Sequence, residues 1–303
     1  MRLPQRVTIV EVGPRDGLQN EKAIISTADK TMLVDRLTTA GHSVIEVSAF
    51  VSPKWVPQMG DAAELFAAIT RRPGVRYTAL VPNRAGLDRA LAAGVTEVAV
   101  FAAASETFSQ RNINRSIDDS LTTYAEVVEA ARAVGVRVRG YLSTCFGCPF
   151  EGAVDPSRVA AVAGRLLALG VFEVAISDTI GIAHPGQVAT VLDAVTTMVP
   201  LDKVALHFHD TRGTALANVL AGLDYGVATF DSSAGGLGGC PFAPGAAGNL
   251  ATEDLVYMLD GLGIETGVSL ERVADASRAI EAKLSHRLPS RYLQAPPFPT
   301  GRR

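Results

Sequence analysis

Cysteine is scarce in this sequence, which contains only three among 303 residues: Cys145, Cys148 and Cys240. A disulfide framework needs more cysteines at more regular spacing, so the composition favours a reducing compartment. Cys145 and Cys148 form a Cys-x-x-Cys pair, but no second pair or nearby histidine completes a tetrahedral zinc site. We interpret these two residues as structural thiols rather than as a metal or redox centre.

The sequence also lacks an excess of basic charge and any long apolar run. Lys and Arg number 28 against 31 Asp and Glu, for a net charge of −3, which argues against nucleic acid or an anionic membrane as a partner. No segment reaches the roughly 20 apolar residues of a spanning helix, because Arg165 and Glu173 interrupt the nearest one. The chain enters an apolar strand almost at once, which leaves no room for a signal peptide. We expect a cytoplasmic protein with a small, soluble substrate.

Eight apolar or β-branched segments are predicted to be strands, and helical patterns separate nearly all of them. The predicted strands are residues 7–12, 43–49, 76–81, 97–102, 136–143, 172–177, 203–209 and 228–233. Several helices end on a glycine directly before a strand, as at Gly41 and Gly226, where glycine supplies a left-handed turn. Eight βα units in a chain of this length predict a (β/α)8 TIM barrel rather than a doubly wound sheet.

No linker divides the chain, so residues 1–303 are predicted to form a single catalytic domain. The barrel would span about residues 5–268, and a C-terminal helix and tail at about 269–303 would form an appendage, with an amphipathic helix from Leu270 to Leu284. Enzymes with this fold place their chemistry at the carboxyl ends of the strands. Candidate residues should therefore gather there.

His207 and His209 lie two residues apart on a predicted strand, so their rings should project to the same face. A histidine on an apolar strand is more often a hydrogen-bonded core residue than a ligand, but the pair at a strand end favours a metal site. Asp16 after strand 1 and Asn249 after strand 8 would add oxygen ligands. Such a mixed set favours Mg²⁺ or Mn²⁺ over a closed zinc site, although Zn²⁺ stays open because Cys240 could approach.

Arg15 and Cys240 are the candidates for catalysis beside this metal. Arg15 could be a structural partner of Glu46 or Glu11, but its place next to Asp16 favours stabilising an enolate or carboxylate oxygen, with Glu46 orienting it. Cys240 lies in a glycine-rich loop that ends at Asn249. An isolated cysteine usually just packs, whereas a thiol on a loop over a metal site can transfer a proton.

Several motifs together resemble one known family, the 3-hydroxy-3-methylglutaryl-CoA lyases. They are Glu11-Val-Gly-Pro-Arg15-Asp16-Gly-Leu-Gln19-Asn-Glu-Lys22, Phe50-Val-Ser-Pro-Lys54-Trp55, Asp178-Thr-Ile-Gly, His207-Phe-His209-Asp-Thr, and the Cys240 loop that runs into Asn249-Leu-Ala-Thr-Glu253. The resemblance extends over nearly the whole chain, and the glycine-cysteine loop is its most specific motif. The Arg-Asp and His-x-His elements alone would indicate only a wider superfamily of metal-dependent lyases and acyl-CoA condensing enzymes.

This resemblance implies retro-Claisen cleavage of 3-hydroxy-3-methylglutaryl-CoA to acetyl-CoA and acetoacetate with a divalent metal, Mg²⁺ or Mn²⁺, in a homodimer. The implied metal ligands are Asp16, His207, His209 and Asn249. The implied catalytic residues are Cys240, Arg15, Asp178, Glu46 and Glu11, and the substrate-binding residues are Arg15, Gln19 and Lys22. Asp178 or His207 would accept the hydroxyl proton, and Cys240 would protonate the enolate.

Departures from the family pattern concern the substrate. Ala49, Arg212 and Thr214 replace residues that other members often have, and we expect all three beside the acyl pocket. A lyase for a longer 3-hydroxy-3-alkylglutaryl-CoA therefore stays open. The sequence is also compatible with a 4-hydroxy-2-oxoacid aldolase, with an acyl-CoA condensing enzyme of the same superfamily, and with a catalytically silent barrel that only binds acyl-CoA or metal.

Overall fold

Eight parallel strands close into a barrel in a computed structural model, which describes residues 3–239 and 248–295. The strands are β1 (Thr8–Glu11), β2 (Val44–Ala49), β3 (Arg76–Leu80), β4 (Glu97–Ala103), β5 (Arg137–Ser143), β6 (Val174–Asp178), β7 (Val204–Phe208) and β8 (Thr229–Ser232). They pair in chain order, and β8 returns to β1. The predicted TIM barrel is confirmed, and each observed strand lies within its predicted segment to within one or two residues.

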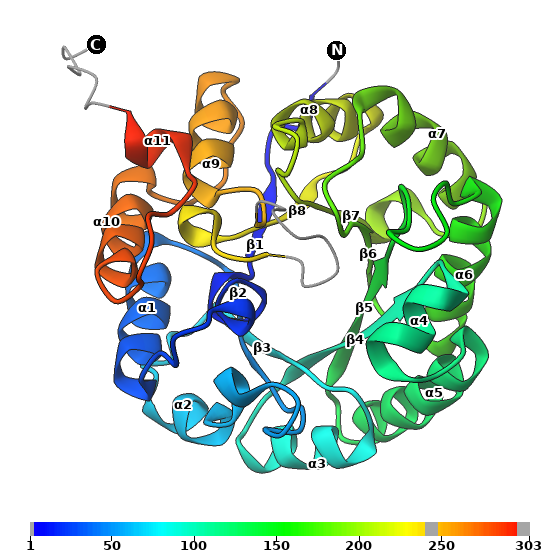
Figure 1. Ribbon diagram of the computed structural model, residues 1–303, viewed down its shortest axis with the longest axis horizontal. Coiled ribbons are helices and arrows are strands. Elements are labelled where there is room, and N and C mark those ends of the chain that lie inside the picture. Colours follow the sequence, from blue (N-terminus) through cyan, green and yellow to red (C-terminus); the bar gives the residue numbers. More distant parts are fainter. Residues whose placement is uncertain (1–2, 240–247, 296–303) are drawn as a thin grey trace.

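Helices form a ring around this barrel (Figure 1). They are α1 (Thr27–Ala40), α2 (Ala62–Ala68), α3 (Arg84–Ala92), α4 (Glu106–Ile113), α5 (Ile117–Ala133), α6 (Pro156–Leu169), α7 (Pro185–Val195), α8 (Ala215–Tyr225), α9 (Thr252–Gly261), α10 (Leu270–Glu281) and α11 (Arg291–Gln294). The glycines expected to end helices do so: Gly41 follows α1 at φ +105° and Gly226 follows α8 at φ +107°. No described helix is long and apolar enough to cross a membrane.

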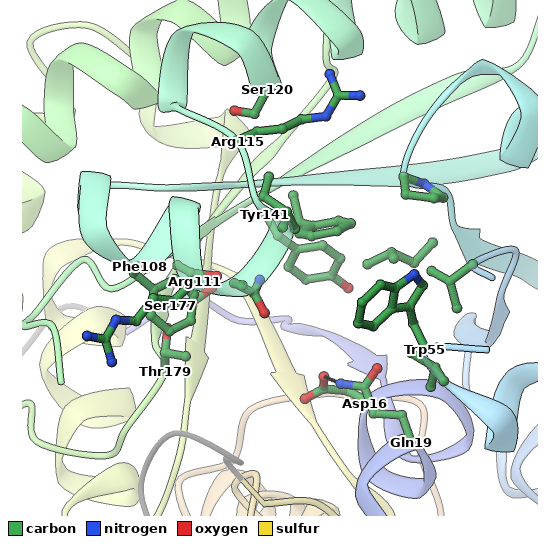
Figure 2. Close-up of a pocket in the computed structure, with 18 of the residues that line it drawn as sticks. Asp16, Gln19, Trp55, Phe108, Arg111, Arg115, Ser120, Tyr141, Ser177 and Thr179 are labelled. Atoms are coloured by element: carbon green, nitrogen blue, oxygen red, sulfur yellow. Dashed lines mark hydrogen bonds between the residues drawn. The ribbon is translucent and has the colours of Figure 1, made fainter. Parts of the chain in front are cut away.

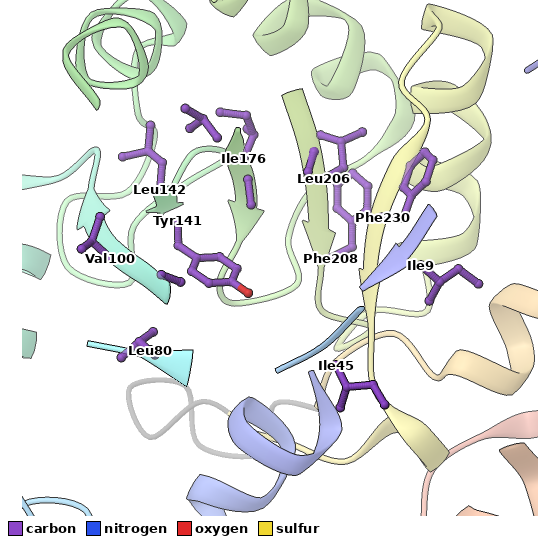
Figure 3. Packing of buried hydrophobic residues seen from close by; sticks show 14 of the residues in the cluster. Ile9, Ile45, Leu80, Val100, Tyr141, Leu142, Ile176, Leu206, Phe208 and Phe230 are labelled. Atoms are coloured by element: carbon purple, nitrogen blue, oxygen red, sulfur yellow. The ribbon is translucent and has the colours of Figure 1, made fainter. Parts of the chain in front are cut away.

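Side chains alternate along each strand between the barrel interior and the helix layer. Ile9 and Ile45 pack into the main core between strands and helices, whereas Val10, Val12 and Val44 form a separate small cluster. Figure 3 shows buried hydrophobic residues of neighbouring strands packed together, and they include both cavity-facing Leu80 and Tyr141 and residues of the outer face. Burying each large aliphatic side chain stabilises the fold by about 1.5 to 3 kcal/mol. This alternation decides which polar strand residues can face the cavity.

The C-terminal helices pack onto the barrel. Helix α10 begins at Leu270 as predicted, ends at Glu281, packs against α1 and α9, and buries Val273 and Ile280. Its buried Ser277 hydroxyl donates a hydrogen bond to Glu253, which in turn accepts the Gly235 backbone N–H. The appendage therefore braces the turn that follows β8.

Candidate metal and active site

The turn after β1 carries Arg15 and Asp16. Residues 13–17 form one wide helical turn in which the Val12 carbonyl accepts the Asp16 N–H at 2.7 Å. A Cβ added at Gly17 would lie 2.6 Å from Leu237 Cβ, so only glycine lets this turn approach the segment after β8. The glycines of the Val-Gly-Pro-Arg-Asp-Gly motif thus hold Asp16 next to the neighbouring strand ends.

Asp16, His207 and His209 form a cluster at the carboxyl ends of β1 and β7. Each offers one ligand atom, and these atoms all lie within 4.8 Å of one another. Asn249 joins them, because its Nδ2 donates to Asp16 Oδ2 at 3.0 Å and its backbone forms a bridge with His209. All four predicted ligands are therefore brought together.

The polar atoms of this cluster suit a divalent cation. His209 Nδ1 and Asn249 Oδ1 are buried and have no hydrogen-bond partner among the described residues. Burial, assisted by His207, lowers the pKa of His209 to about 4, so its imidazole is neutral at pH 7. Burial alone would raise the pKa of Asp16, but Arg15 and both histidines outweigh it and lower that pKa to about 2. His209 and Asp16 thus offer an unprotonated nitrogen and an ionised carboxylate.

Arg15 is fixed by two carboxylates. Its Nε donates to Glu46 Oε2 at 2.5 Å, and its Nη1 donates to Asp16 Oδ1 at 2.6 Å. The side chain is buried, and its guanidinium lies 5.5 Å from the centre of the Tyr141 ring. The expected contact between Glu46 and Arg15 is present, and it orients the guanidinium beside the candidate ligands.

Three further residues of this site were not predicted from the sequence: Arg139, Tyr141 and Asp231. Asp231 Oδ2 lies 3.2 Å from His207 Nδ1, and both Asp231 oxygens accept hydrogen bonds from Arg139. Strand register could have identified Asp231, because it pairs directly with His207 across β7 and β8. Arg139 and Tyr141 were detectable as polar residues two apart on a buried strand, a spacing that places both on one face.

Other predicted site residues lie away from the cavity. Glu11, the last residue of β1, is fully buried on the outer face of that strand and accepts hydrogen bonds from Gly13 N, Ala234 N and the Thr252 hydroxyl. Burial raises the pKa of Glu11 to about 8. Lys22 is exposed and is not among the described residues that line the cavity.

Asp178 is also engaged outside the cavity. Its two oxygens accept the backbone N–H groups of Ile182 and Ala183 at 3.1 and 2.9 Å, and burial raises its pKa. Its neighbours Ser177 and Thr179 line the cavity instead. Asp178 therefore fixes the loop after β6.

Cys240, the predicted proton donor, lies outside the described residues.

A cavity of about 740 Å³ opens above the ligand cluster. Arg15, Asp16, Gln19, His207 and His209 line it together with an apolar group, namely Leu80, Phe101, Phe108 and Tyr124. Figure 2 shows Tyr141 in the middle of this cavity, with Asp16 and Gln19 on one side and Arg115 and Ser120 on the other. Trp55 also lines the cavity, and it is 88% exposed. A cavity of this size accommodates a small organic substrate.

The three departures from the family pattern do not contact this cavity, so their expected position was wrong. Ala49 is buried in the core, Arg212 donates to the Gly181 carbonyl at 2.9 Å, and Thr214 donates to the Ala183 carbonyl at 2.8 Å. None of them is among the described residues that line the cavity. Arg212 and Thr214 support the loop after β6, Ala49 packs in the core, and none of the three carries an argument about the acyl group.

A closed (β/α)8 barrel with an Asp-His-His-Asn cluster and a fixed arginine at its carboxyl end defines a class of TIM-barrel enzymes with a divalent-metal site. A family model described as HMGL-like matches residues 6–280. The chain belongs to this HMGL-like family.

Individual relatives agree with this membership. The chain is 56% identical to the 3-hydroxy-3-isohexenylglutaryl-CoA/hydroxy-methylglutaryl-CoA lyase of Pseudomonas aeruginosa, over 97% of this chain and 98% of the relative. It is 52% identical to the human mitochondrial hydroxymethylglutaryl-CoA lyase, over 97% of this chain and 90% of the relative. A solved lyase structure from Acinetobacter baumannii, in complex with coenzyme A and 3-methylmalate, has a TM-score of 0.92 at 39% identity, over 97% of this chain and 98% of that chain.

Proposed function

We propose that the protein cleaves 3-hydroxy-3-methylglutaryl-CoA to acetyl-CoA and acetoacetate by a metal-dependent retro-Claisen reaction. The observation that carries this proposal is the meeting of four candidate ligands with the fixed Arg15 guanidinium in one cavity. The full-length relatives named as lyases of this type support the same substrate. The reaction needs both the metal ligands and Arg15. The hydroxyl end of the substrate must be polarised, and the thioester end must carry developing negative charge.

In this proposal Asp16, His207, His209 and Asn249 hold Mg²⁺ or Mn²⁺. The carboxylates of this region outnumber its guanidiniums, since Asp16, Glu46 and Asp231 meet Arg15 and Arg139, so a cation improves the charge balance. A bound dication would polarise the substrate's 3-hydroxyl and carboxylate oxygens and lower the hydroxyl pKa.

Arg15 then acts on the thioester end of the substrate. The 3-hydroxyl gives up its proton to water in the open cavity, the C2–C3 bond then breaks, and its electron pair forms the thioester enolate on C2. The Arg15 guanidinium, held by Glu46, stabilises the enolate oxygen, an interaction of a kind typically worth about 10² to 10³ in rate. Gln19, which donates to Asp16 at 3.0 Å, fixes that ligand and lines the same cavity.

We assign the final protonation of C2 to Cys240. The variant Cys240→Ala should retain metal binding and lose about 10² to 10⁴ in turnover, the usual contribution of a proton donor. Single-turnover assays with Mn²⁺ titrations would measure both. Turnover close to that of the unmodified protein would remove Cys240 from the mechanism.

A longer acyl branch is the second candidate. The apolar wall formed by Leu80, Phe101, Phe108 and Tyr124 continues the cavity beyond the ligands, so it offers a surface for an alkyl or alkenyl substituent on C3. The Pseudomonas aeruginosa relative is named for both an isohexenyl and a methyl substrate. We propose that this wall, rather than the ligand cluster, determines which substituent is accepted.

The proposal also includes the setting of the enzyme. We infer a cytoplasmic homodimer in which residues 1–303 form one catalytic domain, with the barrel at about 5–268 and the C-terminal helix and tail at about 269–303. Its partner is an acyl-CoA substrate, in line with the relative solved with coenzyme A. Light scattering on the purified protein would test the dimer.

One substrate panel tests the function. Purified protein with Mg²⁺ or Mn²⁺ is given 3-hydroxy-3-methylglutaryl-CoA, its isohexenyl analogue, or a 4-hydroxy-2-oxoacid, and acetoacetate, the longer oxoacid and pyruvate are quantified. We expect acetoacetate from the first substrate. Pyruvate as the main product would instead support an aldolase, and no product with any substrate would support a silent binding barrel.

A further inference from the structure

We propose that Asp231 is a positioning residue that fixes His207 in the tautomer able to bind a metal. Asp231 lies on β8 directly opposite His207 on β7, and its Oδ2 is 3.2 Å from His207 Nδ1. The Asp231 side chain is fully buried, so no solvent competes for that contact. This inference goes beyond the proposed reaction and concerns how the site is built.

Arg139 holds Asp231 in place from the other side. Its Nη1 and Nη2 donate to the two Asp231 oxygens at 3.1 and 2.8 Å, and its Nε donates to Glu173 Oε1 at 2.7 Å. The guanidinium also lies over the Tyr141 ring, 4.9 Å from its centre. A bidentate pair buried in this way fixes the plane of the carboxylate, so Asp231 presents an oxygen to His207 in one orientation.

The chemical consequence lies in the direction of the hydrogen bond. An ionised carboxylate can only accept, so the proton of a neutral His207 must reside on Nδ1. The lone pair is then on Nε2, which lies 4.0 Å from Asp16 Oδ2 within the ligand cluster. The opposite tautomer would place a proton where a cation must bind. Asp231 therefore selects the tautomer before any metal arrives.

Tyr141 connects this arrangement to the other half of the site. Its ring lies 4.9 Å from the Arg139 guanidinium and 5.5 Å from that of Arg15, and the His207 ring meets it edge-on at 6.4 Å. Tyr141 thus separates two buried cations, each neutralised by its own carboxylates.

The test uses the full-length, metal-free protein and needs no acyl-CoA, so its outcome is independent of the proposed reaction. With ¹⁵N-labelled histidine, long-range ¹H–¹⁵N spectra report the tautomer of each of the five histidines, and His207→Gln assigns the His207 signals. At a pH at which the His207 imidazole is neutral, we expect its Nδ1–H tautomer. Finding the Nε2–H tautomer in the unmodified protein would overturn the proposal, whatever any variant does.

The variant Asp231→Asn removes one of the two acceptor oxygens while keeping the shape of the side chain. Both carboxylate oxygens accept from Arg139, so the new NH₂ opposes the guanidinium in either orientation and the side chain is no longer held in one position. His207 therefore loses its fixed acceptor, and its population should shift toward the Nε2–H tautomer. Mn²⁺ affinity, measured by the free-ion EPR signal, should fall about 10- to 100-fold, as when partners of metal ligands are removed elsewhere. Unchanged affinity together with an unchanged tautomer would contradict the proposed role.

Glu173→Gln is the matched control. It changes the outer contact of Arg139, 2.7 Å from Nε, and leaves the Asp231 carboxylate intact. We expect the His207 tautomer to be preserved and Mn²⁺ affinity to stay within about threefold, well below the 10- to 100-fold loss expected for Asp231→Asn. If Glu173→Gln weakens Mn²⁺ as much as Asp231→Asn does, the effect belongs to general loss of buried charge, and the specific role of Asp231 is rejected.

Discussion

The two sides of the cavity are lined by chemically different residues, charged on one side and apolar on the other. On the side of β1, β7 and β8, Asp16, His207 and Asp231 lie in a chain of contacts with the two buried arginines. On the side of β3, β4 and α4, Leu80, Phe101 and Phe108 present apolar surface. The charged side fixes the positions of the ligand and arginine side chains, whereas the apolar side determines only the shape and volume of the cavity.

This difference indicates how a family of enzymes can keep one reaction while the acyl substituent of its substrate changes. Removing one partner of a buried ion pair leaves the other charge unpaired and costs about 3 to 5 kcal/mol, so the charged side tolerates little change. Adding or removing a methylene in an apolar pocket changes discrimination by only about 1 to 3 kcal/mol. Substitutions on the charged side should therefore affect metal binding and turnover strongly, whereas substitutions on the apolar side should change substrate choice by a smaller factor.

The largest effect is expected from a metal ligand on the charged side. His209→Ala should lower Mn²⁺ affinity by more than about 100-fold, beyond the range for residues that only support ligands, and abolish metal-dependent cleavage. Isothermal titration of the metal-free protein measures the affinity. His184→Ala, which changes an exposed histidine at the start of α7, is the control. Equal Mn²⁺ affinities for His209→Ala and the control would exclude His209 as a ligand.

Arg15→Gln should separate charge stabilisation from metal binding. We expect kcat to fall by about 10² to 10³, because the enolate oxygen loses its fixed donor. Mn²⁺ affinity should change much less than kcat, since all four ligands remain. Arg84→Gln, in an exposed ion pair with Asp88 on α3, should leave both quantities unchanged. A fall in Mn²⁺ affinity as large as the fall in kcat would mean that Arg15 mainly supports Asp16.

On the apolar side, Phe108→Ala should change substrate choice and leave metal binding intact. Enlarging this wall should raise kcat/KM for the isohexenyl substrate relative to the methyl substrate by about 10- to 200-fold, the range expected of an apolar pocket. Competition between the two substrates measures this ratio directly. An unchanged ratio, in protein whose Mn²⁺ affinity and thermal stability are normal, would show that the apolar wall does not select the substituent.

The last effect concerns stability rather than metal binding or turnover, and it comes from Glu11, on the outer face of β1. Its pKa is raised from 4.5 to about 8, so the folded state binds a proton that the unfolded state has lost between those values. Its contribution to stability is therefore present below about pH 4.5 and is lost as pH rises through 8. Urea unfolding between pH 5 and 8 should show a falling free energy of unfolding, with a shallower slope in Glu11→Gln. Identical slopes would contradict the raised pKa.

Local sequence patterns were sufficient to predict the barrel but only part of the site. The β-branched runs and the glycines before strands define the βα units, so β6 was expected at 172–177 and lies at Val174–Asp178. Asp231 was missed because a single aspartate within a short strand has no local signature. Its significance depends on the register that places it opposite His207, which is a long-range property of the barrel.

Glu11 and Asp178 illustrate the other difficulty. Both stand at strand ends, where chemistry is expected, yet each alternates with a neighbour that faces the interior: Val10 in β1 and Ser177 in β6. The period of two along a strand, applied to each residue, would have placed both carboxylates on the outer face. Glu46 lies two residues after Val44 in β2, so both side chains face the interior, and Glu46 contacts Arg15 as predicted.

The central claim is that the charged side performs metal-dependent cleavage of a 3-hydroxy-3-methylglutaryl thioester. Its most direct test is acetoacetate formation from 3-hydroxy-3-methylglutaryl-CoA by purified protein that has been stripped of metal with a chelator and then resupplied with Mg²⁺ or Mn²⁺. We predict no acetoacetate from the stripped protein and recovery of turnover on addition of either ion. Acetoacetate formation that persists without metal, or none after metal is restored, would contradict the account.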